Sequence, residues 1–300
     1  MISKYLRLIR PVAWITFLFP FSVGLGLGIT QKSDPVNIVL AFFVFIFWMS
    51  FSFILNAISD KNVDKYHNGR SKDMNLARQP IVTGEITLKT AFFLSVIFFI
   101  LSLLFAWLIS TFFFILTLLI DLIGYIYSMP PLRLKTKPVG DILCNALAAV
   151  GIFTAGLSFN EQNIDYLIIL GTLLLAAIFY IPTVLTDYDF DKKAGLTTSA
   201  VYFGAKKILQ IMIILTIINI TIWLIICITA NIEFKILGII SIFYSIIFTF
   251  ASNLKLRQQR LYLHENWILI PFPIISLAFI LYGILKLIGW ITLGFFIKFI

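Results

Sequence analysis

Acidic residues recur at a spacing of four in two places along this chain, each where a long apolar segment ends. Asn56, Asp60 and Asp64 form the first set, and Asp187 and Asp191 form the second. Residues four apart project from one face of an α-helix, with a drift of about 40° per step. Carboxylate and amide oxygens are the hard ligands that Mg²⁺ prefers, usually together with substrate phosphates. The pattern therefore indicates a site where divalent cations hold a diphosphate.

Solvated helix ends are the alternative interpretation of either set alone. The chain has only 14 acidic residues, however, and both sets are followed closely by basic residues. An acidic side chain at a helix C-terminus is disfavoured by the helix dipole, so four aspartates in such positions need a compensating cation. We therefore interpret the two sets as metal ligands.

The segments that carry these residues are apolar enough to cross a membrane. Of the 300 residues, 60% are hydrophobic and 12% charged, and the mean hydropathy is +1.01, well beyond soluble domains. Apolar runs of about 18 residues or more cross a bilayer as helices, because hydrocarbon cannot satisfy open backbone polar groups. We read such runs at residues 12–30, 37–58, 90–109, 111–129, 141–159, 166–186, 208–230, 234–254 and 267–285. The sequence predicts one all-α domain over residues 1–300, a multi-pass bundle of about nine transmembrane helices.

The basic residues predict how the bundle is oriented. With the N-terminus in the cytoplasm, 19 of the 23 Lys and Arg residues fall on the inner side, and the exceptions are Lys32, Lys235, Lys286 and Lys298. This asymmetry is the positive-inside pattern. It explains the formal charge of +9 better than nucleic-acid binding does. We expect a multi-pass protein of the cell membrane with no nucleic-acid partner and with both acidic sets at the cytoplasmic face.

Gly24 and Gly28 form a GxxxG pattern in the first apolar run. Small residues at this spacing allow another helix to approach closely. No strand precedes the pattern, so it is not a dinucleotide-binding fingerprint.

The motifs around the acidic sets resemble those of the UbiA superfamily of intramembrane prenyltransferases. NAISDKNVD, residues 56–64, is similar to the family's NDxxDxxxD, with Ala57 in place of the first aspartate, and Asp187 and Asp191 match its DxxxD. RQPIVTGEIT, residues 78–87, resembles the stretch RPxxSGxIS with Gln79 inserted, and YSMPPLRLKTKPVGD, residues 127–141, resembles the inner loop between the fourth and fifth helices. The closest-looking branch contains chlorophyll synthase and lycopene elongase.

The resemblance implies Mg²⁺-dependent transfer of a polyprenyl group from an isoprenoid diphosphate to a hydrophobic acceptor, in a central cavity open to the cytoplasmic side. The implied Mg²⁺ ligands are Asn56, Asp60, Asp64, Asp187 and Asp191. Bound cations neutralise the leaving diphosphate, so that the allylic C–O bond can break toward a carbocation. Lys135, with Arg133 and Arg78, would contact the phosphate oxygens. Tyr127 would orient one of these groups or face the allylic cation with its ring.

Asp121 and Asn145 are polar residues inside predicted spans, and we assign both to a candidate acceptor pocket. A charge within a span is costly, so Asp121 needs a role. It lies at helical spacing from Tyr125 and Ser128, and a hydrogen bond to another helix is the alternative to lining the pocket. Asn145 is close enough to the inner face to touch substrate, with interhelical hydrogen bonding as its alternative.

Two other classes of membrane protein compete with this interpretation. A transporter would place acidic residues near the bilayer midplane on discontinuous helices, and only Asp121 fits that description. A catalytically inactive lipid-binding scaffold would not need both aspartate sets. The DGxxAR core of the CDP-alcohol phosphotransferases is absent from the sequence.

Overall fold

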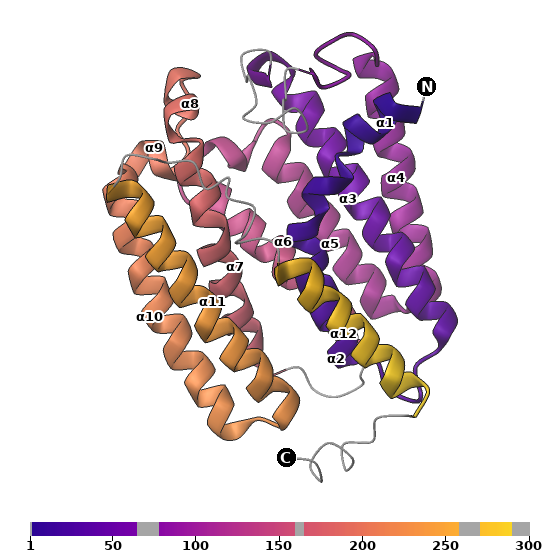
Figure 1. Cartoon of the computed structure of the whole chain (residues 1–300). Coiled ribbons are helices and arrows are strands. Elements are labelled where there is room, and N and C mark those ends of the chain that lie inside the picture. Colours follow the sequence, from indigo (N-terminus) through magenta and orange to yellow (C-terminus); the bar gives the residue numbers. More distant parts are fainter. Residues whose placement is uncertain (1, 65–77, 160–164, 258–270, 290–300) are drawn as a thin grey trace. The chain divides into compact units, whose positions relative to one another are not determined.

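The computed structural model describes residues 2–64, 78–159, 165–257 and 271–289, and within these ranges all regular structure is helical (Figure 1). Eight helical segments in the described residues are long and apolar enough to cross a membrane: Ser3–Gly28, Pro35–Asp64, Leu88–Ile109, Thr111–Ser128, Gly140–Leu157, Tyr166–Thr186, Ala205–Thr229 and Ile232–Leu254. A further apolar helix, α12 (Pro271–Leu287), has 17 residues and falls on the ninth predicted span. The prediction of an all-α, multi-pass bundle is therefore confirmed.

The chain divides into two compact units. The first consists of Met1–Leu132, Gly151–Glu161 and Pro271–Ile300, and the second of Arg133–Val150 and Gln162–Ile270. The single domain over residues 1–300 and the orientation of the termini stay predictions. Several of the basic residues counted for the orientation, including Lys65, Arg70, Lys72 and Lys298, lie outside the described residues.

The first unit is built around the long helix α3. Its elements are α1 (Ile2–Ile9), the 3-10 turn η1 (Pro11–Trp14), α2 (Ile15–Gly28), α3 (Pro35–Asp64), α4 (Leu88–Ile109), α5 (Thr111–Ser128), the second half of α6 (Gly140–Leu157) and α12. Helix α3 packs against α4 and α5, and α2 packs against α12. Trp48 stacks on Phe113 with ring centroids 5.9 Å apart, and both rings are buried in the core that α3 shares with α5.

The connection between α4 and α5 is a single residue. Ser110 ends α4 and begins α5, and its extended backbone (φ −169°, ψ 160°) turns the chain. Its hydroxyl accepts a hydrogen bond from the N–H of Phe113 at 3.0 Å, which caps the start of α5. Apolar residues continue on both sides of Ser110, and this one cap separates them into two helices.

The second unit contains the 3-10 turn η3 (Leu134–Thr136), the first half of α6, α7 (Tyr166–Thr186), α8 (Tyr188–Lys193), α9 (Ser199–Phe203), α10 (Ala205–Thr229) and α11 (Ile232–Arg257). Helices α7, α10 and α11 pack on one another, and α10 and α11 run side by side (Figure 1). Trp223 is fully buried because Gly171 makes room for it: a Cβ on Gly171 would lie 2.8 Å from the indole ring.

Candidate active site

The last turns of α3 carry the first acidic set. Helix α3 continues without interruption to Asp64, so Asn56, Asp60 and Asp64 lie one helical turn apart, as predicted. Asp64 is buried with 6% of its surface exposed, and the other two side chains are partly buried. The predicted span ended at residue 58, and the helix extends six residues further to include the whole set.

Ala57, the departure from the family motif, belongs to an apolar cluster. It is 5% exposed and packs with Leu8 of α1, Ile54 of α3, and Ile81 and Ile86 of the loop before α4. A methyl group suits this cluster, whereas a carboxylate among these side chains would lose its hydration. The structure therefore gives a packing reason for alanine at this position.

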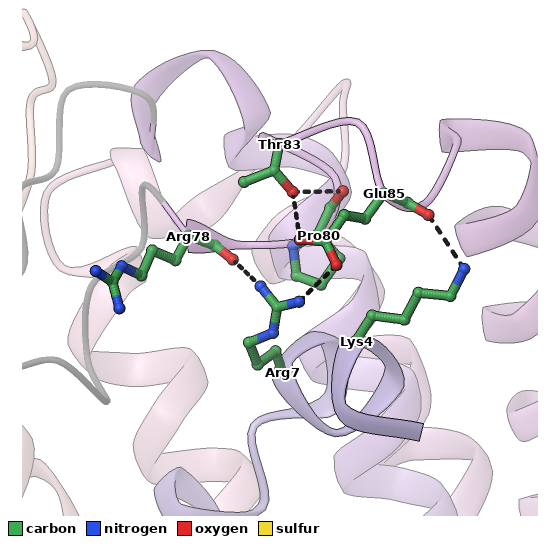
Figure 2. Close-up of polar contacts among 6 residues, drawn as sticks. All are labelled: Lys4, Arg7, Arg78, Pro80, Thr83 and Glu85. Carbon is green, nitrogen blue, oxygen red and sulfur yellow. Dashed lines mark hydrogen bonds and ion pairs between the residues drawn. The ribbon is translucent and has the colours of Figure 1, made fainter. Parts of the chain in front are cut away.

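Arg78 lies at the start of the loop before α4, and α1 holds this loop (Figure 2). The Arg7 guanidinium donates one hydrogen bond to the Arg78 carbonyl at 3.0 Å and another to Glu85 Oε2 at 2.6 Å. Thr83 Oγ1 donates to Glu85 Oε1 at 3.0 Å, and Lys4 Nζ donates to the Glu85 carbonyl at 3.3 Å. Figure 2 shows the Arg78 side chain extending away from Arg7 and Glu85. The N-terminal helix thus fixes the main chain of Arg78 and leaves its guanidinium outside this cluster.

Glu85 is held in its charged form by these contacts. The hydrogen bond from Arg7, and then the one from Thr83, lower the pKa of the Glu85 carboxyl, and the charges of Arg7 and Lys4 act in the same direction. Desolvation opposes them and is outweighed. The ion pair with Arg7 is therefore present at neutral pH.

The second acidic set spans the junction of α7 and α8. The Asp187 N–H donates to the Thr183 carbonyl, and the Asp191 N–H donates to the Asp187 carbonyl at 2.8 Å, so Asp187 and Asp191 are one helical turn apart. Asp187 ends α7 and also begins α8, where the helix dipole favours acidic residues. The dipole penalty expected for this set is therefore relieved by the new helix. Asp191 Oδ2 also accepts a hydrogen bond from Thr198 Oγ1 at 3.0 Å.

Arg133 and Lys135 lie in the turn before α6. Arg133 begins η3 with a left-handed backbone (φ 41°), and Lys135 within η3 is 9% exposed. Asp141, in the first turn of α6, is 2% exposed and anchors this turn to the first residue of α9. Its carboxylate accepts hydrogen bonds from the Ser199 N–H at 2.8 Å and from the Ser199 hydroxyl. The Ser199 hydroxyl accepts one from the Val139 N–H at 2.7 Å.

Asp121 is buried between α4 and α5 with 1% of its surface exposed. The Ser102 hydroxyl lies 2.7 Å from Asp121 Oδ2 and also 2.7 Å from the Phe99 carbonyl oxygen. One hydroxyl has one proton and a carbonyl can only accept, so both hydrogen bonds form together only when Asp121 is protonated and donates to Ser102. The contact joins two helices, which is the alternative that the sequence left open for Asp121.

Asn145 and Tyr127 lie near the inner ends of their helices. The Asn145 side chain donates to the Asp141 carbonyl of its own helix at 2.8 Å and is half-buried. Tyr127 is half-buried in the last turn of α5. The roles predicted for both residues toward substrate stay predictions.

The two acidic sets belong to different compact units. Asn56, Asp60 and Asp64 are in the first unit, and Asp187 and Asp191 are in the second. The described residues contain no group of three or more His, Cys, Asp and Glu side chains arranged to hold a metal. The meeting of the two sets stays a prediction.

Sequence reasoning missed the residues that support the predicted site. Arg7 and Glu85 hold the loop of Arg78, Thr198 contacts Asp191, and Asp141 holds the turn of Lys135. An acidic residue at the very start of a predicted membrane span, as at residue 141, is a signal that could have found Asp141. No signal distinguishes Thr198 from the neighbouring hydroxyl residues of the segment TTS.

The profile of the UbiA prenyltransferase family matches residues 17–267, most of the chain. The chain belongs to the UbiA prenyltransferase family. The family resemblance seen in the motifs is thus confirmed, and with it the prediction that this protein is an enzyme that transfers prenyl groups.

Solved structures and curated proteins agree with the family. A UbiA homolog from Archaeoglobus fulgidus bound to DMAPP and Mg²⁺ is 45% identical to this UbiA-family protein, with a TM-score of 0.90 over 95% of this chain and 99% of that one. A structure of a UbiA homolog from the same organism bound to GPP and Mg²⁺ is 44% identical, with the same TM-score and coverage.

Among curated relatives, a 4-hydroxybenzoate octaprenyltransferase of Legionella pneumophila (strain Corby) is 24% identical over 97% of this chain and 96% of its own length. A digeranylgeranylglyceryl phosphate synthase of Methanosphaera stadtmanae is 24% identical over 86% of this chain and 89% of its own length. The family, the enzyme class and the multi-pass membrane fold of this UbiA prenyltransferase are therefore established. The acceptor branch and the roles of single residues stay predictions.

Proposed function

We propose that this UbiA prenyltransferase moves a prenyl group from an isoprenoid diphosphate to a hydrophobic acceptor in the membrane, with Mg²⁺ as its cofactor. The observation that carries the proposal is the pair of acidic helix ends, Asn56 to Asp64 on α3 and Asp187 to Asp191 across α7 and α8. They occur in a chain 45% identical to a homolog whose structure holds DMAPP and Mg²⁺.

The donor set fits the cation. Each acidic helix end offers hard oxygen atoms one helical turn apart, which is the ligand type that Mg²⁺ takes beside phosphate oxygens. The residues that would hold Mg²⁺ are Asn56, Asp60, Asp64, Asp187 and Asp191. When bound, the cation supplies positive charge against the diphosphate leaving group.

Basic residues of the chain would bind the diphosphate together with Mg²⁺. Lys135, Arg133 and Arg78 would donate charge-assisted hydrogen bonds to its oxygens, where negative charge grows as the allylic C–O bond breaks. The tether from Arg7 supports this role for Arg78, because it fixes the main chain and leaves the guanidinium outside the Arg7 and Glu85 cluster. Tyr127 would present its aromatic ring to the allylic cation.

The acceptor is the least constrained part of the proposal. The two curated relatives carry names with different products, so membership of the family does not by itself set the acceptor. The segment YSMPPLRLKTKP favours acceptors of the chlorophyll synthase and lycopene elongase branch, which should be tested first. The distribution of basic residues supports a site at the cytoplasmic face.

Membranes that contain the enzyme provide the test. They are incubated with radiolabelled geranylgeranyl diphosphate, Mg²⁺ and a panel of acceptors, and the labelled lipid is identified by mass spectrometry. We expect EDTA to stop the transfer of label and added Mg²⁺ to restore it. A transporter or an inactive scaffold would form no new lipid under any of these conditions.

Single substitutions test the assignment of the ligands. Asp60→Asn and Asp191→Asn should each nearly abolish transfer, because an amide is a poorer ligand than a carboxylate. Asp189→Asn is the matched control, since Asp189 is exposed on α8, two residues from both ligands, and points to another side of the helix. Near-normal transfer by either Asp60→Asn or Asp191→Asn would refute the assignment.

A further inference from the structure

The segment that joins α8 to α9 turns back on Asp191. The Gly195 N–H donates to the Lys192 carbonyl at 3.2 Å, and the Leu196 N–H donates to the Asp191 carbonyl at 2.9 Å. These two bonds form a Schellman motif, which needs the left-handed backbone that Gly195 supplies with φ +71°. The main chain of Asp191 is therefore fixed by the turn that follows it.

Thr198 fixes the side chain of the same aspartate. Its hydroxyl donates to Asp191 Oδ2 at 3.0 Å, and Thr198 is only 6% exposed, so water competes little for this bond. Threonine before a short helix is ordinarily explained as an N-cap. Thr198 is in the N-cap position of α9 but makes no side-chain cap hydrogen bond. The Thr198 hydroxyl therefore serves Asp191 and not the helix.

Thr197 and Ser199, on either side of Thr198, anchor the segment to the turn of Lys135. The Thr197 hydroxyl donates to the carbonyl of Thr136 in η3 at 2.9 Å. Ser199 bonds to Asp141 in the first turn of α6 and to the N–H of Val139, in the short link between η3 and α6. The three consecutive hydroxyl residues Thr197, Thr198 and Ser199 thus join the Asp191 carboxylate to the turn that carries Lys135.

We propose that Thr198 is a positioning residue that presents the Asp191 carboxylate to Mg²⁺. The inference rests on the proposed function of Asp191 as a metal ligand. A carboxylate whose rotation is already fixed by a hydrogen bond loses less freedom when it binds a cation. Removing a supporting hydrogen bond of this kind typically weakens metal binding or activity about 10- to 100-fold.

The test is a metal titration that does not depend on turnover. Purified protein in detergent is supplied with geranyl S-thiolodiphosphate, a slowly reacting donor analogue, and Mn²⁺ is added while free Mn²⁺ is followed by electron paramagnetic resonance. Thr198→Val should raise the Kd for Mn²⁺ about 10-fold or more. Thr198→Ser, which keeps the hydroxyl, should bind close to wild type. Thr172→Val is the matched control, because Thr172 is also buried but its hydroxyl bonds, among the described residues, only to the Ile168 carbonyl of its own helix.

The same titration separates failure of folding from failure of positioning. An unfolded fraction lowers the number of Mn²⁺ sites per chain, whereas a misplaced Asp191 raises the Kd of the sites that remain. Thr198→Ala is measured as a second variant without the hydroxyl. Wild-type Kd in both variants, with weakened binding by Asp191→Asn, would overturn the positioning role alone. Wild-type binding by Asp191→Asn would overturn the proposed metal site itself.

Discussion

Helices α2 and α6 touch through their backbones at Gly24, and the substitution Gly24→Ala tests this contact. An added Cβ on Gly24 would lie 2.1 Å from the Phe153 carbonyl oxygen, and one on Gly28 would lie 2.3 Å from the Gly156 carbonyl oxygen. Ordinary van der Waals contact begins at 3.4 Å, so in Gly24→Ala the new Cβ and the Phe153 carbonyl oxygen must move 1.3 Å further apart (3.4 less 2.1). Both partners are main-chain atoms of helices, so the two helices must move apart.

The expected loss of stability follows from two opposing effects. Overpacking costs about 1–3 kcal/mol, and a clash between two backbones belongs at the upper end of that range. Alanine regains about 1 kcal/mol of helix propensity over glycine. The net destabilisation is therefore about 2 kcal/mol, which corresponds to a fall in Tm of about 3 °C at an unfolding entropy of about 2.1 cal/mol/K per residue over the 300 residues.

Thermal unfolding of the purified protein in mild detergent, followed by tryptophan fluorescence, measures this change. Gly124→Ala on α5 is the control, because its added Cβ would meet the Ser52 hydroxyl at 2.8 Å and the Ser52 Cβ at 3.7 Å, and the hydroxyl can rotate away. We expect the control to unfold no more than about 1 °C below wild type. A Gly24→Ala protein that is as stable as this control would refute the close approach of α2 and α6.

Substitutions at three further positions test other parts of the first unit. Ala57→Asp, which restores the residue usual in the family, should lower the unfolding free energy by about 2 kcal/mol or more, because it buries a carboxylate among apolar side chains; an unchanged Tm would contradict the cluster described for α1 and α3. Asp121→Asn should unfold like wild type because its amide can donate to Ser102 as a protonated carboxyl does, and Asp121→Ala should unfold at lower temperature; equal losses in both variants would exclude the protonated form. Since Arg7 lowers the pKa of Glu85, their ion pair stabilises the fold above the ordinary pKa of 4.5, and this stabilisation is lost as the pH falls through the lowered pKa of Glu85. The Arg7→Ala protein should therefore lose less unfolding free energy than wild type on acidification. Identical pH profiles of unfolding would argue against the ion pair.

Hydropathy alone located the membrane helices well and their polar ends poorly. The predicted span 166–186 is the observed helix α7, because an apolar run begins and ends where that helix does. Helix α3 continues past its predicted end to Asp64, since backbone hydrogen bonds need no apolar side chains. The acidic spacing, and not the hydropathy, indicated that the helix includes those last turns.

The residues that support the site could not be predicted because their partners are distant in the chain. Asp141 and Ser199 are 58 residues apart, and Arg7 and Glu85 are 78 apart. The sequence around one residue of each pair does not indicate which distant residue it will contact. Residues that carry charge at a repeated spacing were predicted, whereas single hydroxyl groups such as that of Thr198 became visible only with the fold.

Ser110 fixes which faces of α4 and α5 lie against each other. Because this one residue both ends α4 and begins α5, there is no longer loop between the helices that could compensate for an inserted or deleted residue. One inserted residue in α5 would rotate the preceding part of the helix by about 100° relative to the rest, and would turn Ser102 away from Asp121. Relatives that lengthen or shorten this hairpin should therefore do so by whole helical turns, or should lack the buried acid altogether.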